Sequence, residues 1–480
     1  MATDVPGDDT APAGWMEIWR SGHVARFMVL CFGVWLHAAD FALVATLLPD
    51  AVIEIGGAYL LNWNVALYQL GSIVAGVSTG ILAIRYGLAR SLIYGAAVYV
   101  VGCALSAIAP NMETILAGRV LQGLGGGFLV ALVLVGVNDI FPSRMAPRVL
   151  AVVSIVWGSS AFIGPLIGGV FAEFGLWRAG FWAFGAQGIV FILAVWFCLR
   201  DVDKISTTAI KLPVRRLILL SLSVIAISWA GAISEAGRTD PMVYALAIAG
   251  LVMLILFFTQ DGRAGDSRLL PRRAVDIRTR TGAGVALVLF FATATIPFTV
   301  YGPLLLKVLY GIGPLQAGYI LALGSIAWTV GAVTFSGVSR TREGWVIVVG
   351  ALLIAVSTIG LALAVPERGV LAILPFLFLE GAGFGMAYAF IVRRVVEDVR
   401  TDDRERAAAA MATVQEMGYA LGAAACGIVA NVAGFAEGIS VVAARQSGFW
   451  LFAAFVPFGV LSVVLAWNIA TRPQQQGEPS

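Results

Sequence analysis

Five ionisable side chains lie deep inside apolar stretches of this 480-residue chain: Asp40, Arg119, Glu380, Glu416 and His37, which precedes Asp40 by three positions. A charge at the centre of a lipid bilayer costs about 2.5–3.5 kcal/mol on insertion scales, so such residues mark functional sites. Desolvation favours the neutral form of a carboxylate. Asp40 could therefore take up and release a proton, with His37 as a relay, and we take all five residues as candidates for proton coupling.

Structural roles remain open for each of these residues. A buried guanidinium needs an acceptor, and for Arg119 the candidates are Asp40 and the carbonyl groups at helix ends. Protonation of Asp40 would weaken such a pair and could bias a conformational equilibrium. Alternatively, the arginine pins two helices together, and the acids and the histidine satisfy hydrogen bonds between helices.

The same acids could also attract a cationic substrate. Glu380 and Glu416 belong to the C-terminal part of the chain, opposite Asp40 in the expected arrangement. Aromatic rings beside these acids could line an apolar cavity and make cation–π contacts. The expected substrate-binding set therefore combines Asp40, Glu380 and Glu416 with the rings of Trp35, Phe41, Tyr68, Trp157, Phe162, Trp328 and Tyr388.

Long apolar segments must position these groups. Hydrophobic residues make up 60% of the chain and charged residues 12%, with a mean hydropathy of +0.91. Soluble domains carry roughly 25% charged residues, and a membrane-spanning helix needs about 20 apolar residues. We therefore predict an all-α polytopic membrane protein with fourteen spans, at 24–48, 58–83, 91–109, 114–137, 149–171, 180–199, 217–233, 242–259, 282–306, 317–338, 345–365, 370–392, 407–430 and 448–469. In the alternative, twelve helices cross and the middle pair lies in the interface.

An internal repeat organises the spans. One constant spacing separates Gly123 from Gly381, Arg148 from Arg406, and Gly164 from Gly422. Duplicated halves of this kind are typical of alternating-access transporters, with the substrate site between them. The expected division is a tail at 1–22, a six-helix bundle at 23–200, a linker with two extra spans and basic segments at 201–280, a second bundle at 281–470 and a tail at 471–480. Pro271 and the alternation around Asp276–Arg280 suggest a short helix on the membrane surface. In the alternative, the basic residues there only set the orientation of the chain.

The basic residues set the expected orientation. With a cytoplasmic N-terminus, Lys and Arg concentrate in cytoplasmic segments, and outer loops hold only Arg178, Arg238, Lys307, Arg368 and Arg445. We therefore expect a bacterial-type inner membrane location with both termini cytoplasmic. The net charge of +3 reflects this topology, and we expect no nucleic-acid partner. Residues 1–22 lack the apolar core of a signal peptide.

Several chemistries are not indicated. The four cysteines are scattered within apolar spans and give no disulfide framework or metal-ligand spacing. The glycines around Gly123 lack the Lys-Ser or Lys-Thr pair of a phosphate-binding loop. We therefore expect no metal, no cofactor and no enzymatic activity, with the proton gradient as the energy source.

The span at 149–171 contains several glycines and a proline. The run from Trp157 to Gly169 reads Trp-Gly-Ser-Ser-Ala-Phe-Ile-Gly-Pro-Leu-Ile-Gly-Gly. Pro165 removes a backbone hydrogen bond and bends the helix, whereas glycines allow a neighbouring helix to approach closely. The motif glycines of this span are Gly158, Gly164, Gly168 and Gly169. A bent, tightly packed membrane span is the expected result.

Together these features resemble the fourteen-helix drug:proton antiporters of the major facilitator superfamily, the multidrug and quaternary-ammonium exporter type. The Trp157–Gly169 run resembles the family's antiporter motif, and Arg119 with Gly123 matches its fourth-helix motif. Ala39-Asp-Phe-Ala-Leu-Val-Ala-Thr-Leu-Leu-Pro49 is similar to the family's first-helix sequence. The resemblance implies proton coupling at Asp40, a conformational relay at Arg119 and cation recognition at Glu416. It implies nothing for Glu380.

One family motif is altered. After the second span the family reads Gly-x-Leu-Ala-Asp-Arg-x-Gly-Arg-Lys, and this chain keeps Gly80, Arg85 and Gly87. Ile84 replaces the acid, and Leu88-Ala89 replace the Arg-Lys pair. In the family that acid helps to hold the cytoplasmic side closed, so this latch is in doubt here.

We therefore predict a proton-coupled exporter of amphipathic, cationic small molecules that works by alternating access. The alternative on the same fold is an exporter of a lipid, a siderophore or another endogenous metabolite. A sensor or scaffold without transport activity would not need buried charges. Expected partners are the substrate, protons and membrane lipids. We expect a monomer, and no feature of the sequence indicates a periplasmic adaptor.

Overall fold

The computed structural model describes residues 22–142, 145–202, 212–234 and 240–472. These residues form helices joined by short turns, without strands. The predicted tails at 1–22 and 471–480 lie almost wholly outside them. The helices are α2 (Val24–Ile55), α3 (Leu61–Tyr86), α4 (Leu88–Ala107), α5 (Met112–Ile140), α6 (Ala146–Glu173), α7 (Trp177–Leu199), α8 (Val214–Ala232), α9 (Pro241–Gly262), α10 (Arg280–Tyr310), α11 (Pro314–Phe335), α12 (Glu343–Ala364), α13 (Val370–Asp398), α14 (Arg404–Val432), α15 (Val441–Ala453) and α16 (Val456–Thr471).

The fourteen predicted spans all correspond to helices in the described part of the chain, with α15 and α16 together forming the last. Thirteen of these segments are long and apolar enough to cross a membrane. The exception, α14, is long enough but less apolar. It packs against α3, α8 and α10, so much of its surface contacts protein instead of lipid. In a bilayer only helices satisfy every backbone group within the segment, which explains the all-helical architecture.

Local sequence sets several helix ends. The side chain of Asn111 accepts a hydrogen bond from the Thr114 amide at the start of α5, and Thr279 caps α10 in the same way. Between α3 and α4, Gly87 adopts a φ of +81°, a conformation that favours glycine. The turn there needs no further residues.

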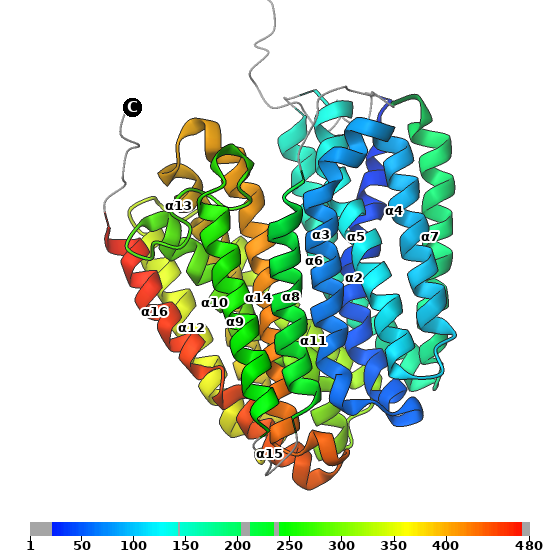
Figure 1. Ribbon diagram of the computed structural model, residues 1–480, viewed down its shortest axis with the longest axis vertical. Coiled ribbons are helices and arrows are strands. Elements are labelled where there is room, and N and C mark those ends of the chain that lie inside the picture. Colours follow the sequence, from blue (N-terminus) through cyan, green and yellow to red (C-terminus); the bar gives the residue numbers. More distant parts are fainter. Residues whose placement is uncertain (1–21, 143–144, 203–211, 235–239, 473–480) are drawn as a thin grey trace, which may run out of the picture.

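Two bundles of six spans each lie side by side (Figure 1), one built from α2–α7 and the other from α10–α16, in which α15 and α16 form one span. The packing of one bundle repeats in the other. Helix α5 packs against α3 and α4, and α13 packs against α11 and α12. The repeated glycines make equivalent helix contacts in the two bundles. Gly123 contacts α3 at Tyr68, and Gly381 contacts α11 at Gly324. Gly164 contacts α2, and Gly422 contacts α10.

The inserted pair, α8 and α9, consists of two full helices of 19 and 22 residues. They pack against each other, and α8 also packs against α14 and α3. Gly231 of α8 meets the backbone of Gly427 in α14, with an added Cβ only 2.9 Å from that carbonyl carbon. In Figure 1, α8 lies between the two bundles. Both helices have the length of a membrane crossing, which favours fourteen spans over twelve.

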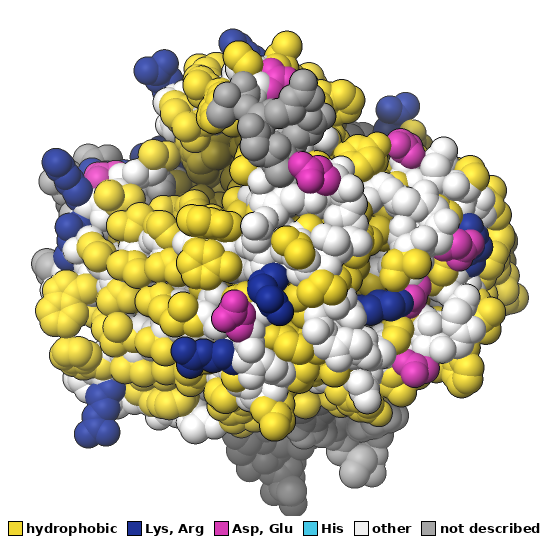
Figure 2. Space-filling view, turned by 90° about the horizontal axis from the view of Figure 1, so that it is seen from below, with side chains coloured by type: hydrophobic (Ala, Val, Ile, Leu, Met, Phe, Trp, Pro, Cys, Tyr) yellow, Lys and Arg dark blue, Asp and Glu magenta, His cyan; other side chains and the backbone are white. Residues whose placement is uncertain are grey.

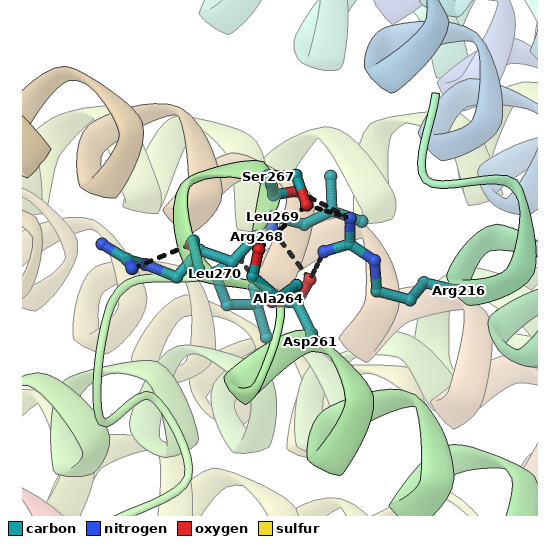
Figure 3. Close-up of polar contacts among 8 residues, drawn as sticks. Arg216, Asp261, Ala264, Ser267, Arg268, Leu269 and Leu270 are labelled. Atoms are coloured by element: carbon teal, nitrogen blue, oxygen red, sulfur yellow. Dashed lines mark hydrogen bonds and ion pairs between the residues drawn. The ribbon is translucent and has the colours of Figure 1, made fainter. Parts of the chain in front are cut away.

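The surface helix expected around Pro271–Arg280 is absent. This connection forms turns that are held by side chains of the inserted pair (Figure 3). Asp261 accepts hydrogen bonds from the amides of Leu269 and Leu270, at 2.8 and 2.9 Å, and pairs with Arg216 at 2.5 Å. Because the buried Asp261 carboxylate accepts from these amides, the start of the connection is tied to the end of α9.

The last predicted span also differs from its expected form. It is divided into α15 and α16 at Ala454 and Phe455, and Pro457 occupies the first turn of α16. Proline has no amide hydrogen and is well tolerated there, at the start of a new helix.

The chain ends distinguish the two ends of the molecule. The start of α2 and the end of α16 lie at one end, which we call the terminal end, and we call the other the distal end (Figure 1). Figure 2 views the distal end and shows single charged side chains scattered over a largely apolar and neutral face. Apolar side chains cover much of the outer surface of both bundles and of α9.

Candidate functional site

An ion pair is buried at the centre of the N-terminal bundle. Asp40 of α2 is 0% exposed and Arg119 of α5 is 1% exposed. Nη1 of Arg119 donates to Oδ2 of Asp40 at 2.7 Å. Of the two acceptors considered for Arg119 from the sequence, Asp40 is the one in contact. Removing one partner of such a buried pair strongly destabilises the folded protein, because the other charge loses its counter-ion.

Further contacts fix the arginine. Nη1 also donates to Oε1 of Gln122 at 2.8 Å, and the guanidinium lies 4.0 Å from the centre of the Tyr68 ring. The Gln122 amide in turn lies 3.2 Å from Sγ of Cys103 on α4. Arg119 therefore keeps polar and cation–π partners in addition to Asp40. It can remain in place when the charge of Asp40 changes.

Aromatic rings surround His37. The Tyr68 hydroxyl lies 3.0 Å from Nδ1 of His37 and donates to its backbone carbonyl at 2.9 Å. The two rings are stacked with centroids 5.3 Å apart, and the exposed Trp157 of α6 lies 5.7 Å from His37. Gly126 allows this approach, because an added Cβ would meet Nδ1. His37, Tyr68, Arg119 and Asp40 thus form one connected cluster.

Two contacts made by neighbours of this cluster on α2 and α3 reach the C-terminal bundle. The Phe41 ring stacks against Tyr419 of α14 at 6.3 Å. The Ser72 hydroxyl of α3 donates to Oε1 of Glu416 on α14 at 3.2 Å. Glu416 therefore lies at the interface between the bundles, where a changing carboxylate charge would alter a contact between them.

Glu380 lies elsewhere. Its carboxylate accepts from the Ser357 hydroxyl of α12 at 3.3 Å, inside the C-terminal bundle. Near it on α13, Phe384 stacks on Trp328 of α11 with centroids 4.4 Å apart, and Tyr388 lies 6.1 Å from Trp328. These rings form a cluster within the second bundle. Among the described residues, no hydrogen bond or ion pair joins Glu380 to a residue of the Asp40 cluster.

Two other aromatic candidates are not part of either cluster. The Trp35 indole donates to Oε1 of Gln187 on α7 at 2.9 Å, so this ring is turned into the N-terminal bundle. Phe162 is half-buried on α6.

The glycines of α6 separate into two faces. An added Cβ at Gly164 would lie 2.7 Å from the carbonyl oxygen of Ala39, the residue before Asp40, and Gly168 meets the Leu43 backbone. On the other face, Gly169 would meet Cα of Leu315 in α11 at 2.8 Å. The carbonyl of Pro165 accepts from Thr46 of α2 at 3.1 Å.

Helix α6 is therefore packed between the Asp40 helix and the opposite bundle. Gly158, nearer the terminal end, is less confined, with Thr329 as its nearest neighbour at 3.7 Å.

The altered motif lies at the terminal end. Gly80 and Arg85 belong to the last turns of α3, and Gly87 forms the turn to α4. Arg85 is exposed and lies over the ring of Tyr86 at 5.4 Å. In the second bundle, the acid Glu343 pairs with Arg393 at 2.5 Å.

Some interface residues were not singled out from the sequence. At the distal end Lys307 of α10 forms an ion pair with Asp50 of α2, and the Glu173 carboxylate accepts from the amide of Leu315 at 3.3 Å. In the sequence Asp50, Glu173 and Lys307 appear only as charged residues next to loops, and such residues are too common to indicate an interface. The side chain of Asn64, in the first turns of α3, is 1% exposed and carried no motif.

Comparison with known proteins places this arrangement in a family. The model of the Major Facilitator Superfamily matches residues 30–423. A probable multidrug-efflux transporter of Mycobacterium tuberculosis (strain ATCC 25618 / H37Rv) is 30% identical, covering 96% of this chain and 97% of its own. Multidrug resistance protein 3 of Bacillus subtilis (strain 168) is 23% identical over 84% of this chain and 79% of its own.

Solved structures agree in fold. A peptide transporter in complex with sulfate superposes with a TM-score of 0.68 at 17% identity, covering 96% of this chain and 97% of its own. A D-xylose-proton symporter gives 0.65 at 15% identity, covering 95% and 99%. The predicted resemblance and fold are confirmed: this chain belongs to the major facilitator superfamily, as a multi-pass membrane transporter and not an enzyme.

Proposed function

We propose that this transporter exports amphipathic, cationic small molecules in exchange for protons. The observation that carries the proposal is the buried Asp40–Arg119 pair and its position against α6. Gly164 of α6 packs on the residue next to Asp40, while Gly169 packs on α11 of the other bundle. A change in the charge of Asp40 therefore acts on a helix that contacts both halves.

The contacts between the bundles support a closed distal side. Lys307 pairs with Asp50, Gly169 meets Leu315, and Glu173 binds the first turn of α11. We propose that the terminal end is cytoplasmic, as the distribution of Lys and Arg indicates. The arrangement then corresponds to a state closed to the outside.

In the proposed cycle, proton and substrate favour different states. Neutral Asp40 binds Arg119 less strongly, whereas Arg119 retains Gln122 and the Tyr68 ring. A ligand shifts a conformational equilibrium only by its differential affinity for the two states. Protonation of Asp40 and of Glu416, at the interface between the bundles, would favour one state, and cation binding at the same acids would favour the other. These opposite preferences couple the two fluxes. In this scheme His37 tunes Asp40, and Glu380 is a second acid within the C-terminal bundle.

Proton movement in proteoliposomes tests the proposal. Vesicles with an entrapped pH-sensitive dye and an imposed pH gradient are challenged with lipophilic monocations and dications. We expect cation-triggered proton movement in the wild type, its loss in Asp40→Asn, and its retention in Glu113→Gln, which alters an exposed carboxylate at a helix start. Asparagine keeps an oxygen acceptor for Arg119 but removes its counter-charge, so the unfolding temperature of Asp40→Asn is compared with that of the wild type before the loss is assigned to proton coupling. A folded wild type that responds to none of the cations would contradict the proposal and favour a lipid or metabolite exporter.

A further inference from the structure

A small cavity of about 10 Å³ lies between the two bundles beside Arg119. Leu48 of α2 and Asn64 of α3 line one side, and Thr299 of α10 lines the other. Helix α2 runs from the terminal end to the distal end, and the α2 residues of the cavity wall follow Asp40 along it. The cavity therefore lies on the distal side of the Asp40–Arg119 pair.

Several polar atoms at this place have no hydrogen-bond partner within the described chain. Both side-chain atoms of Asn64 are buried without one, and so is Nε of Arg119. Asp40 does not line the cavity, but it lies one helical turn before the wall residue Val44, and its Oδ1 also lacks a hydrogen-bond partner. A buried polar group without a hydrogen bond costs several kcal/mol in an apolar medium, and native proteins satisfy nearly all of them. One carboxamide left with both atoms unpaired, next to a cavity, indicates a polar occupant.

The size and the chemistry fit a single water molecule. A bound water needs a volume of about 10–15 Å³ and two to four polar partners. Asn64 offers a donor and an acceptor, and Arg119 offers a further donor. We propose that Asn64 holds water in this cavity and that protons reach Asp40 from the distal side through it. This inference rests on the proton exchange proposed above.

The proton balance is simple. The cavity water gives up a proton that passes to Oδ1 of Asp40, the oxygen that Arg119 does not occupy. Because the distal side is closed in this state, the water is reprotonated from outside when the distal end opens. Asp40 becomes neutral and the water is unchanged. Asn64 keeps its carboxamide throughout, so it acts as a positioning residue.

Three variants separate this role from simple packing. Asn64→Leu removes both polar atoms at similar size, and Asn64→Ser restores one hydroxyl with more room. The control, Asn62→Leu, removes a carboxamide of the same helix that is equally buried and unpaired but packs against Gly427, away from the cavity wall.

Two transport readouts are needed. We expect Asn64→Leu to slow cation-triggered proton movement by about tenfold or more, the effect of losing one well-placed hydrogen-bond partner. Cation–cation exchange without a pH gradient should stay unchanged, and Asn64→Ser and Asn62→Leu should resemble the wild type in both assays. An equal loss of exchange in Asn64→Leu would overturn the proton route and assign the cavity to substrate. Normal proton movement in Asn64→Leu would overturn it too.

Hydroxyl-radical labelling by radiolysis tests the water directly, because it marks side chains beside bound water. We expect labelling of the cavity residues Leu61 and Val65 in the wild type and a clear decrease in Asn64→Leu. If the wild type moves no protons but shows this decrease, the proposed exchange fails while the water site stands. Unlabelled residues in the wild type would overturn the water site.

Discussion

The packing of α6 gives a sharp prediction, because two glycines of one motif have different surroundings. A Cβ added at Gly164 would lie 2.7 Å from the Ala39 carbonyl oxygen and 2.9 Å from Cβ of Ala42. The first of these atoms is backbone and cannot move without shifting α2. A Cβ at Gly158 would find only Thr329 Oγ1, at an ordinary 3.7 Å. We therefore compare Gly164→Ala with Gly158→Ala.

The magnitude follows from two terms. Replacing a helical glycine by alanine stabilises by roughly 0.5–1 kcal/mol, and this term is common to both variants. Overpacking a tight contact costs about 1–3 kcal/mol, and it applies only at Gly164. We therefore expect Gly158→Ala to be as stable as the wild type or slightly more stable, and Gly164→Ala to be less stable than Gly158→Ala by about 1–3 kcal/mol.

Thermal unfolding of the purified variants in one detergent measures this difference. The unfolding temperature should be lower for Gly164→Ala than for both the wild type and Gly158→Ala. Transport should fall with it, because α2 carries Asp40 beside the new methyl group. Equal unfolding temperatures for the two variants would refute the reasoning, since it depends on the contact with Ala39 and not on glycine itself. A lower value for Gly158→Ala alone would also refute it.

Two further predictions concern charged contacts at the two ends. Arg216→Met leaves the buried Asp261 without its cation, so we expect the free energy of unfolding to fall by about 3–5 kcal/mol and proteolysis of the 263–280 connection to become faster. As a control, Arg215→Met at the exposed neighbouring position should behave as the wild type in both assays. Lys307→Gln removes a partly exposed pair worth up to about 1 kcal/mol. Labelling of a cysteine placed at Leu315 from the distal side should therefore rise measurably, by up to about fivefold. The exchanged pair Asp50→Lys with Lys307→Asp should restore the wild-type labelling rate, and a rate unchanged by Lys307→Gln would show that this pair does not hold the distal side closed.

Much of the fold was predictable because a membrane helix can be identified from its own local sequence. Length and hydropathy alone located the spans, including the inserted pair, since a bilayer leaves helices as the practical choice for an apolar chain. The repeat was also visible, because glycines are needed wherever two backbones approach closely, and the positions equivalent to Gly123 and Gly164 do so in both halves. The sequence likewise named Asp40 as a possible partner of Arg119.

The connection at 263–280 shows where local pattern fails. Alternating charges and Pro271 suggested a surface helix, but the segment turns back because Asp261, Arg216 and the backbone amides satisfy one another. The sequence could not reveal this, because Arg216 and Asp261 lie on separate helices and the conformation of the connection depends on how those helices pack.

The sequence by itself determined the class of protein, the positions of the long apolar helices and the set of buried charges, because each depends on the transfer of local side chains from water to lipid. Only the tertiary structure decided which way each helix faces. Glu416 meets Ser72 across the bundles while Glu380 turns to Ser357 within its own, although both are acids in apolar helices. The rotation of such helices is set by close packing and hydrogen bonds between them and not by burial alone.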